Sequence, residues 1–408
     1  MVRNEYNTEQ PLIMHVDLNS AFATIEQQSR PLLRGCPVAI INRRTENTSI
    51  ITASYEAKVF GVKVGMKFTE AARLAKGLVA IESDPAKYRF VYHKLMGILN
   101  DYSPHVVMKS IDEGVMDFHN LANQRPLIEI GCEIKQRLRD EIGIAMRCNV
   151  GIGPNRFLAK TAAGLNKPDG MDVVDATNLR EVYSKLKLKD LTGIAGAMEG
   201  RLNAVGIYTP LEFLDTDKIV LQKIVFKSIS GSQWYDRLRG YEVDDRVSTT
   251  KTIGRQYVLE DRNISRSEIT ARLHNLCESI GFRLRSQNMV ARGLYVYIKT
   301  VDRQYWHSCR MCQLPFYSNE TINALAQQLF SKAPNRIQEI GLHCYELSDN
   351  DNSQISLFND QFMREQKLVD VIDDINQRFG DRMIHSANTL CTNKIVKQKI
   401  PFGSTRYL

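Results

Sequence analysis

Two adjacent carboxylates, Asp112 and Glu113, lie between two apolar segments of the chain. Neighbouring side chains on a strand point to opposite faces, so two acids in a row can line one site only where the chain bends. Gly114 relaxes the backbone at such a bend. A third acid, Asp17, ends the apolar run 12–16. Three acids at strand ends are what a pair of divalent cations needs to hold a triphosphate, because close carboxylates repel unless cations separate them. Taken alone, an acidic turn can equally be a solvated loop.

Four strands and two helices are expected to position these acids. The expected strands cover 11–17, 106–111, 114–118 and 146–152, and the expected helices cover 19–28 and 127–142. With the segment 30–83 set aside, the order β-α-β-β-α-β is that of a ferredoxin-like arrangement, whose first and third strands are neighbours. This topology would bring Asp17 beside Asp112.

Size and composition restrict the class of protein. At 408 residues the chain should form two to four domains, and 43% hydrophobic and 25% charged residues are typical of a soluble globular protein. No run of 18 or more apolar residues occurs and residues 1–10 are polar, so neither a membrane span nor a secretory signal is expected. The eight cysteines are scattered and include a single CxxC, which favours reduced thiols in a cytoplasmic protein.

The charge is unevenly distributed along the chain. A net charge of +8 and a pI of about 9.0 favour a polyanionic partner. Residues 251–310 carry 11 Lys or Arg against 5 Asp or Glu, whereas residues 349–408 carry 8 of each. The basic segment is therefore interpreted as a nucleic-acid grip, with a solvated basic face as the alternative.

Further side chains could contact a nucleotide. Phe22 follows Asp17 closely and would lie on the first turn of the next helix, although a core aromatic is the alternative. On a helix, Tyr55 and Lys58 are three positions apart and share a face, so both could reach a triphosphate. Lys167 projects just before a Pro-Asp-Gly turn.

Two glycine-containing segments suggest phosphate-binding loops. Gly193 and Gly196 lie in a segment similar to a helix-hairpin-helix, whose glycines let backbone amides approach a phosphate. An ordinary turn between two helices is the alternative. No Gly-Lys-Ser/Thr follows Gly153, so that loop is not a Walker motif.

Together and in this order, these segments resemble the Y-family of DNA polymerases, the translesion enzymes, and within it the bacterial UmuC-like branch. The resemblance covers roughly residues 12–345 and continues more weakly to the C-terminus. It implies an α+β multidomain protein shaped as a right hand, with a ferredoxin-like palm, small fingers, a helix-hairpin-helix thumb and an α+β little finger. The implied parts are palm 11–29 and 84–174, fingers 30–83, thumb 175–240, linker 241–250, little finger 251–347 and C-terminal tail 348–408.

The resemblance also implies an activity: DNA-directed, low-fidelity transfer of a nucleotide from a dNTP to a primer 3′-hydroxyl on damaged primer-template DNA. It assigns Asp17, Asp112 and Glu113 as ligands of two Mg²⁺ ions, with the Leu18 carbonyl as a further ligand. The implied nucleotide contacts are Phe22, Thr52, Tyr55, Lys58 and Lys167, and the implied DNA contacts are Gly193, Gly196, Lys251 and Arg255. Phe22 corresponds to the steric gate that excludes a 2′-hydroxyl.

Two residues depart from the family pattern. Lys58 stands where Arg is more frequent, which replaces a bidentate fork by a point charge. Ala21 stands where an aromatic residue usually precedes the gate. Neither change removes a catalytic group, but Ala21 leaves nucleotide selectivity and lesion preference open.

The C-terminal region suggests protein partners. Gln354, Leu357 and Phe358 belong to a pentapeptide that resembles the bacterial sliding-clamp-binding motif and follows a polar stretch, 348–353. The helix-like segment 368–380 resembles the tail of UmuC-like chains, and it could dock on a partner such as a UmuD-like accessory subunit or pack on its own domain. A two-metal nuclease and a catalytically silent, clamp-tethered DNA-binding protein are the rival functions, and the intact acid triad argues against the second.

Overall fold

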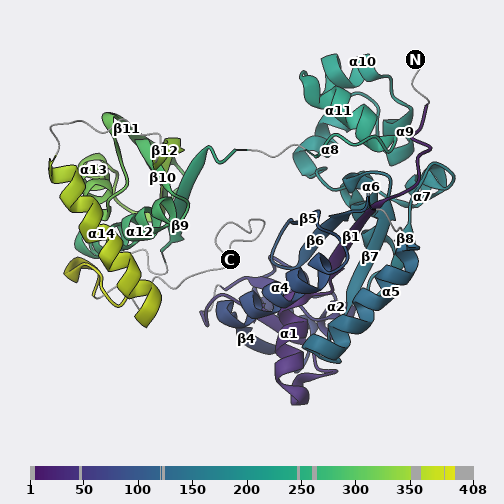
Figure 1. Cartoon of the computed structure of the whole chain (residues 1–408), viewed down its shortest axis with the longest axis horizontal. Helices are drawn as coiled ribbons and strands as arrows, with labels where there is room; N and C mark the ends of the chain where they lie inside the picture. The colour runs from purple at the N-terminus through teal and green to yellow at the C-terminus, as the bar shows by residue number, and fades with distance from the viewer. Residues whose placement is uncertain are drawn as a thin grey trace. The chain divides into compact units, whose positions relative to one another are not determined.

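The computed structural model describes residues 5–45, 48–119, 121, 125–245, 249–259, 264–350, 360–380 and 382–390. The chain divides into two compact units (Figure 1). The first unit comprises Met1–Arg246 and Lys399–Leu408, and the second comprises Val247–Gln398. The division lies within 241–250, the segment expected to be a linker.

A five-stranded sheet, called the central sheet below, organises the first unit in the order β5-β6-β1-β7-β8. Its strands are β1 (Ile13–Leu18), β5 (Val106–Met108), β6 (Glu113–Asp117), β7 (Cys148–Gly153) and β8 (Met171–Val173). Strand β1 pairs antiparallel with both β6 and β7. The predicted neighbourhood of the first and third strands is therefore confirmed.

The two faces of β1 serve different purposes. Met14, Val16 and Leu18 are buried in the main core of the unit. That core is shared with three helices, α1 (Ala21–Ser29), α4 (Pro85–Asn100) and α5 (Leu127–Arg137) (Figure 1). The alternate residues, His15 and Asp17 among them, belong to the opposite face because side chains alternate along a strand. Helix α6 (Arg156–Leu165) packs on that side, where its Ala159 contacts Ile13.

The turn that carries the acids is longer than expected. Strand β5 ends at Met108, three residues before the predicted end at 111, and β6 already begins at Glu113. The reason is a local hydrogen-bond pattern, in which the backbone amides of Lys109 and Ser110 both donate to the Glu113 carbonyl. Glu113 is consequently a strand residue and only Asp112 lies in the turn. The predicted helix over 127–142 is present, with α5 continuing as a π-helical turn from 138 to 142.

Two smaller subdomains complete the first unit. The segment 30–83 forms a three-stranded sheet of order β3-β2-β4 with two short helices, and a region of short helices follows β8. The elements of the first are β2 (Val38–Ile41), β3 (Ile50–Ala53), α2 (Tyr55–Val59), α3 (Phe68–Leu74) and β4 (Val79–Glu82). Those of the second are α7 (Leu179–Lys185), α8 (Gly196–Asn203), α9 (Pro210–Asp215), α10 (Lys218–Val220) and α11 (Ile229–Leu238).

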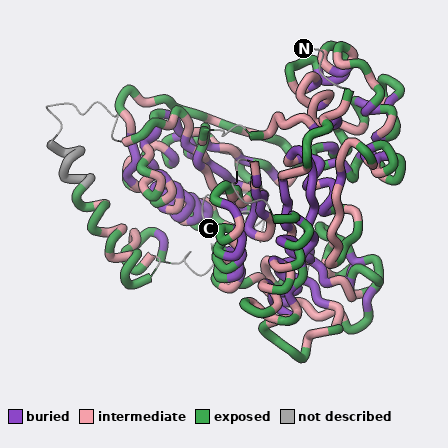
Figure 2. Tube along the Cα trace, turned by 45° about the vertical axis from the view of Figure 1, so that its right-hand side comes forward, coloured by how far each residue is buried: buried purple, intermediate pink, exposed green. Residues whose placement is uncertain are grey.

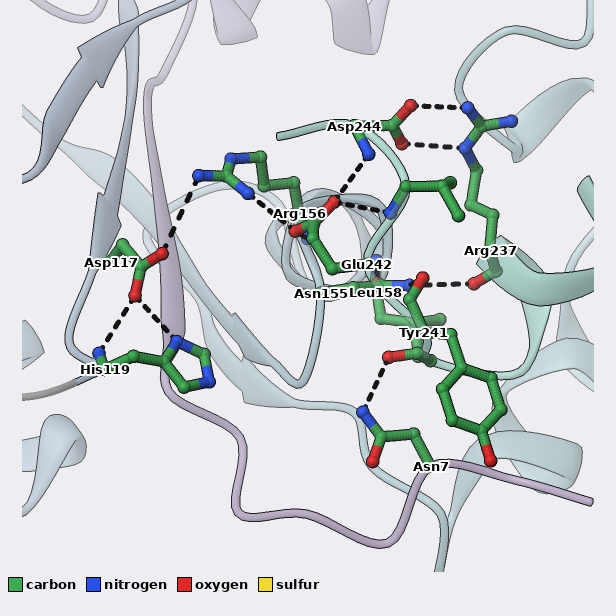
Figure 3. Close-up of polar contacts among 12 residues, drawn as sticks. Asn7, Asp117, His119, Asn155, Arg156, Leu158, Arg237, Tyr241, Glu242 and Asp244 are labelled. Atoms are coloured by element: carbon green, nitrogen blue, oxygen red, sulfur yellow. Dashed lines mark hydrogen bonds and ion pairs between the residues drawn. The ribbon is translucent and has the colours of Figure 1, made fainter. Parts of the chain in front are cut away.

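The start of the predicted linker is attached to the first unit (Figure 3). The Asn155 side-chain amide donates to the carbonyls of Arg237 and Tyr241, both at 2.9 Å. Arg156 forms an ion pair with Glu242 at 2.8 Å, and a longer one with Asp117 at 3.7 Å. The chain up to about Asp244 therefore belongs to the folded unit, because Arg237 of α11 also pairs with Asp244 at 2.5 Å.

The second unit is a four-stranded antiparallel sheet, β11-β10-β12-β9, packed on two helices. Its elements are β9 (Thr252–Val258), α12 (Arg266–Arg285), β10 (Met289–Thr300), β11 (Tyr305–Phe316), α13 (Asn319–Phe330) and β12 (Ile337–Asp349). Strand β12 runs two residues beyond the predicted domain end at 347, because Ser348 and Asp349 still pair with β10.

The C-terminal helix α14 (Asp360–Phe379) is connected to α12 of the same unit. Arg285 makes two bonds with Asp373, at 2.6 and 3.0 Å, and both side chains are largely buried. Farther along, Arg382 pairs with Glu278 of α12. These contacts favour packing of the tail helix on its own domain, although much of its surface is exposed (Figure 2).

The pentapeptide with Gln354, Leu357 and Phe358 lies outside the described residues. Among the helices that the structure describes, none has the length and apolarity required to cross a membrane.

Candidate catalytic site

An acidic cluster forms where β1 and β6 pair. Asp17 is in register with Glu113, so the two side chains share a face of the central sheet. His15, two residues before Asp17, lies on the same face. One potential ligand atom from each of these three residues lies within 4.8 Å of the others. The buried His15 imidazole contacts Glu113, with 3.2 Å between Nε2 and Oε2.

Two lysines neutralise the cluster. The Lys160 ammonium lies 2.9 and 2.7 Å from the two Glu113 oxygens, and the Lys167 ammonium lies 2.5 Å from Asp17 Oδ2. Burial by itself would raise the pKa of Glu113, but the hydrogen bonds and charges of His15 and Lys160 outweigh it and lower the pKa to about 2. Glu113 is therefore ionised at neutral pH and available to a cation.

Asp112 has a different environment. Burial raises the pKa of its carboxyl group, the Ser110 hydroxyl opposes this by donating a hydrogen bond, and the charges of Asp17 and Glu113 raise it further. Its backbone carbonyl accepts from the Leu18 amide at 2.9 Å, which connects the turn to the end of β1. The Asp112 carboxyl thus lies within the electrostatic reach of the cluster, and its ionised form would require a compensating cation.

The loop that carries Lys167 is held by buried asparagines. Asn19 accepts a hydrogen bond from the Asp169 amide at 2.8 Å and donates one to Asn149 at 2.9 Å. Asn149, which is fully buried on β7, donates in turn to the Asn166 carbonyl at 3.1 Å. This network fixes the loop next to Asp17, because each asparagine both donates and accepts.

The predicted phosphate-contacting residues of α2 point to the same region. Ser54 caps the helix by accepting from the Ala57 amide. As expected from their spacing, Tyr55 and Lys58 share a face, with the ammonium 4.4 Å from the ring centroid. Lys58 also donates to Ser20 at 2.8 Å, beside Asp17 on the chain. Burial and then the Lys167 charge lower the pKa of Lys58, against the opposing effect of Asp17. These charges therefore interact at one site. Thr52 lies one element earlier, on β3.

The other predicted residues have varied surroundings. Phe22 is buried, with 3% of its surface exposed, and its ring stacks on Tyr88. Gly196 begins α8, and Gly193 has a φ of +98°, which favours glycine, with the Trp234 ring 3.2 Å from the place of a Cβ. In the second unit Lys251 is exposed, whereas Arg255 is half-buried and donates to Ser279 of α12.

Two residues of the cluster were not predicted. His15 could have been found, because it precedes Asp17 by two positions and alternation along a strand places both on one face. Lys160 had no such signal, since a lysine on a helix is usually a solvated residue and only the packing of α6 brings it to Glu113.

The residues present fit divalent cations. Carboxylate oxygens are the ligands that Mg²⁺ prefers, and Asp17 and Glu113 offer them from paired strands. Both carboxylates already attract ammonium groups, which shows that the cluster favours positive charge. Imidazole suits other metals better, so His15 is more suited to orienting Glu113 than to binding Mg²⁺.

Comparisons with known proteins identify the relatives of this chain. Residues 16–164 match the model of the impB/mucB/samB family, and residues 249–357 match that of the impB/mucB/samB family C-terminal domain. A protein of Moorella thermoacetica named DNA polymerase IV is 31% identical over 394 residues, which are 93% of this chain and 96% of that protein. A Bacillus velezensis protein of the same name is 27% identical over 383 residues, 91% and 92% of the two chains.

Solved structures show the same fold. A Y-family DNA polymerase chimera of Dbh and Dpo4 matches with a TM-score of 0.68 and 22% identity, covering 83% of this chain and 99% of that one. An insertion ternary complex of Dbh DNA polymerase matches with a TM-score of 0.59 and 21% identity over the same shares. The predicted α+β multidomain polymerase fold is confirmed. Family models, full-length relatives and fold together show that this chain belongs to the impB/mucB/samB family of Y-family DNA polymerases.

Proposed function

We propose that this DNA-directed DNA polymerase carries out two-metal nucleotidyl transfer on damaged templates, with Asp17, Asp112 and Glu113 as ligands of two Mg²⁺ ions. The observation that carries the proposal is the pairing of Asp17 with Glu113 across β1 and β6, where His15 contacts Glu113 and two lysines balance the charge of the acids. Asp112 and the Leu18 carbonyl, which adjoin the pair, complete the proposed ligand set.

Bound Mg²⁺ would lower the pKa of the primer 3′-hydroxyl and stabilise the leaving pyrophosphate. Lysine side chains of the protein would supply the rest of the electrostatic stabilisation of the phosphates. Lys167 and Lys58 would offset the charge that develops on the phosphates, and the hydrogen bonds that hold them pre-orient both ammonium groups. His15 and Lys160 keep Glu113 ionised and fixed in place.

Selection of the nucleotide is assigned to the elements beside this cluster. Thr52 and Tyr55, on β3 and α2, would contact the triphosphate together with Lys58. Phe22 would act as the steric gate against a 2′-hydroxyl. Its burial agrees with a ring that is held in place, which a steric gate requires.

The proposed DNA contacts lie in the segments 175–240 and 251–347. The amides at Gly193 and Gly196 would approach a backbone phosphate, while Lys251 and Arg255 would contact the duplex from the second unit. Arg255 donates a hydrogen bond to Ser279 of α12, which holds its side chain on the second unit. In this proposal the central sheet is the palm, and 30–83, 175–240 and 251–347 are fingers, thumb and little finger.

The tail is proposed to connect the enzyme to other proteins. Gln354, Leu357 and Phe358 would bind the sliding clamp, and a UmuD-like subunit is a further proposed partner. A cytoplasmic location belongs to the same proposal, on the ground that the cysteines within the described ranges are free thiols.

The test removes the acid that lies in the turn before β6. Asp112→Ala should reduce dNTP incorporation by at least about 10³-fold, because it deletes a proposed ligand of both metal ions. DNA affinity should be retained, since losing an anion weakens no phosphate contact. Asp140→Ala, which deletes an exposed carboxylate of the same unit, is the matched control and should extend primers normally.

The outcomes separate the candidate functions. Near-normal extension by Asp112→Ala would refute the assignment of the metal site. Primer shortening instead of extension by the parent protein would identify a two-metal nuclease, and binding with neither reaction would identify a catalytically silent DNA-binding protein.

A further inference from the structure

The proposed gate residue has a buried aromatic neighbour. The rings of Phe22 on α1 and Tyr88 on α4 are stacked, with 4.3 Å between their centroids and 7° between their planes. Both side chains are almost completely buried, with 3% and 1% of their surfaces exposed. Stacked rings at this distance exclude any other atom between them, so movement of Phe22 toward α4 is blocked.

Tyr88 is itself fixed at its other end. Its hydroxyl donates to Glu26 at 3.2 Å, and Glu26 lies four residues after Phe22 on the same face of α1. The Glu26 carboxylate is fully buried and is compensated by Lys87, at 2.8 Å, and by Arg30, at 3.4 Å. A buried, ion-paired carboxylate is costly to displace, so it anchors the phenol hydroxyl firmly.

Tyr88 therefore contacts α1 at two points one helical turn apart, with its ring against Phe22 and its hydroxyl on Glu26. Exclusion of a 2′-hydroxyl by a side chain is effective only if that side chain does not yield. A phenylalanine ring can turn about two side-chain bonds, and a flat neighbour that cannot move removes that freedom.

We propose that Tyr88 is a positioning residue for sugar selection, which holds the Phe22 ring in place through the stack and is itself held by Glu26. The proposal rests on the assignment of Phe22 as the steric gate. Its effect is on the choice between ribose and deoxyribose and not on the chemical step, because Tyr88 stacks on Phe22, donates to Glu26 and is buried in the main core.

The experiment compares two tyrosines of α4. Tyr88→Met keeps the core filled with a flexible chain but offers no flat ring, Tyr88→Phe keeps the ring and loses the hydroxyl, and Tyr92→Met is the control at another buried tyrosine of the same core. Each variant is tested by primer extension with one dNTP or its matching rNTP, and the ratio of the two kcat/KM values is recorded beside a melting curve.

We expect Tyr88→Met to raise the rNTP/dNTP ratio by about threefold to tenfold. Tyr88→Phe should stay nearer the parent ratio, and Tyr92→Met should lower the melting midpoint without changing the ratio. Phe22→Ala should raise the ratio by about 10²-fold or more. Adding Tyr88→Met to Phe22→Ala should produce no further rise, because Tyr88 acts through the ring that is then missing.

Two results would contradict the inference in distinguishable ways. If Phe22→Ala raises the ratio but Tyr88→Met matches Tyr92→Met, the gate is correct and Tyr88 is only a core residue. If Phe22→Ala melts earlier with an unchanged ratio, Phe22 is itself a core residue and both assignments are wrong. Should Tyr88→Met melt below the assay temperature, Tyr88→Leu provides the same comparison.

Discussion

Two sites of this polymerase, one in each unit, use positive charge differently. In the first unit, the ammonium groups of Lys160 and Lys167 bind carboxylates, so their charge is balanced locally. In the second unit, Arg266 donates instead to the neutral backbone carbonyls of Phe330 at 2.6 Å and Ala333 at 3.0 Å. Such a bond fixes the side chain without cancelling its charge.

The difference suits the two kinds of phosphate that the proposed function requires the chain to bind, the triphosphate of a dNTP and the backbone phosphates of DNA. In a balanced site, the ion pairs between lysines and carboxylates hold the side chains together. The net charge of such a site changes only when a metal cation or a triphosphate replaces one partner of a pair. An unbalanced surface attracts a polyanion from a distance and in a salt-dependent manner. The tail, with 8 basic and 8 acidic residues in 349–408, carries no net charge and should act through apolar contacts.

The largest effect on the affinity for a partner is expected in that neutral tail. Replacing Leu357 and Phe358 together by alanine should remove the apolar anchor of the proposed clamp motif and cost a few kcal/mol of clamp binding, or about 10²-fold in affinity. Clamp-stimulated extension should be lost, while extension without clamp is unchanged. The control replaces Leu368 and Val371, two exposed apolar residues of α14. Equal stimulation of the motif variant and the parent would show that the pentapeptide is a chance match.

A balanced cation of the first unit comes next. Lys167→Ala should raise the KM for dNTP by about 10- to 100-fold, because it removes the proposed charge-assisted contact with the triphosphate. The Kd for DNA should not change, and steady-state kinetics together with a binding titration measures both. Lys185, an exposed lysine of the same unit that pairs with Glu181 at 2.7 Å, provides the control. A comparable loss of DNA affinity in Lys167→Ala would remove the distinction between the two units.

The smallest effect concerns a cation of the second unit. Arg255→Ala should weaken DNA binding only a few-fold, but it should lower the slope of log K against log salt by about one, as expected for one lost phosphate contact. Arg336→Ala should leave the slope unchanged, because Asp302 already pairs with that exposed arginine at 3.4 Å. Identical slopes for Arg255→Ala and the parent would show that the Arg255 guanidinium stabilises the fold and does not contact DNA.

Much of the architecture could be predicted because it depends on local patterns. The apolar run around Val16 and the helical spacing from Leu127 to Ile142 each produced the expected element, and the element order predicted the pairing of β1 with β6. Element ends were less accurate. Strand β5 is shorter than predicted because the amides of Lys109 and Ser110 turn back to the Glu113 carbonyl, and no pattern of side chains reports such a bond.

The sequence by itself determined the chemical class of the site, because residue types and their order specify carboxylates at strand ends, cations near them and an aromatic residue behind Asp17. Only the tertiary structure decided which groups meet. Glu113 contacts His15 across 98 positions of sequence and Lys160 across 47, and Phe22 stacks on a tyrosine of another helix. These contacts depend on strand register and helix packing, which are set by the burial of many apolar side chains at once. The types of the two residues in contact therefore do not predict that they meet.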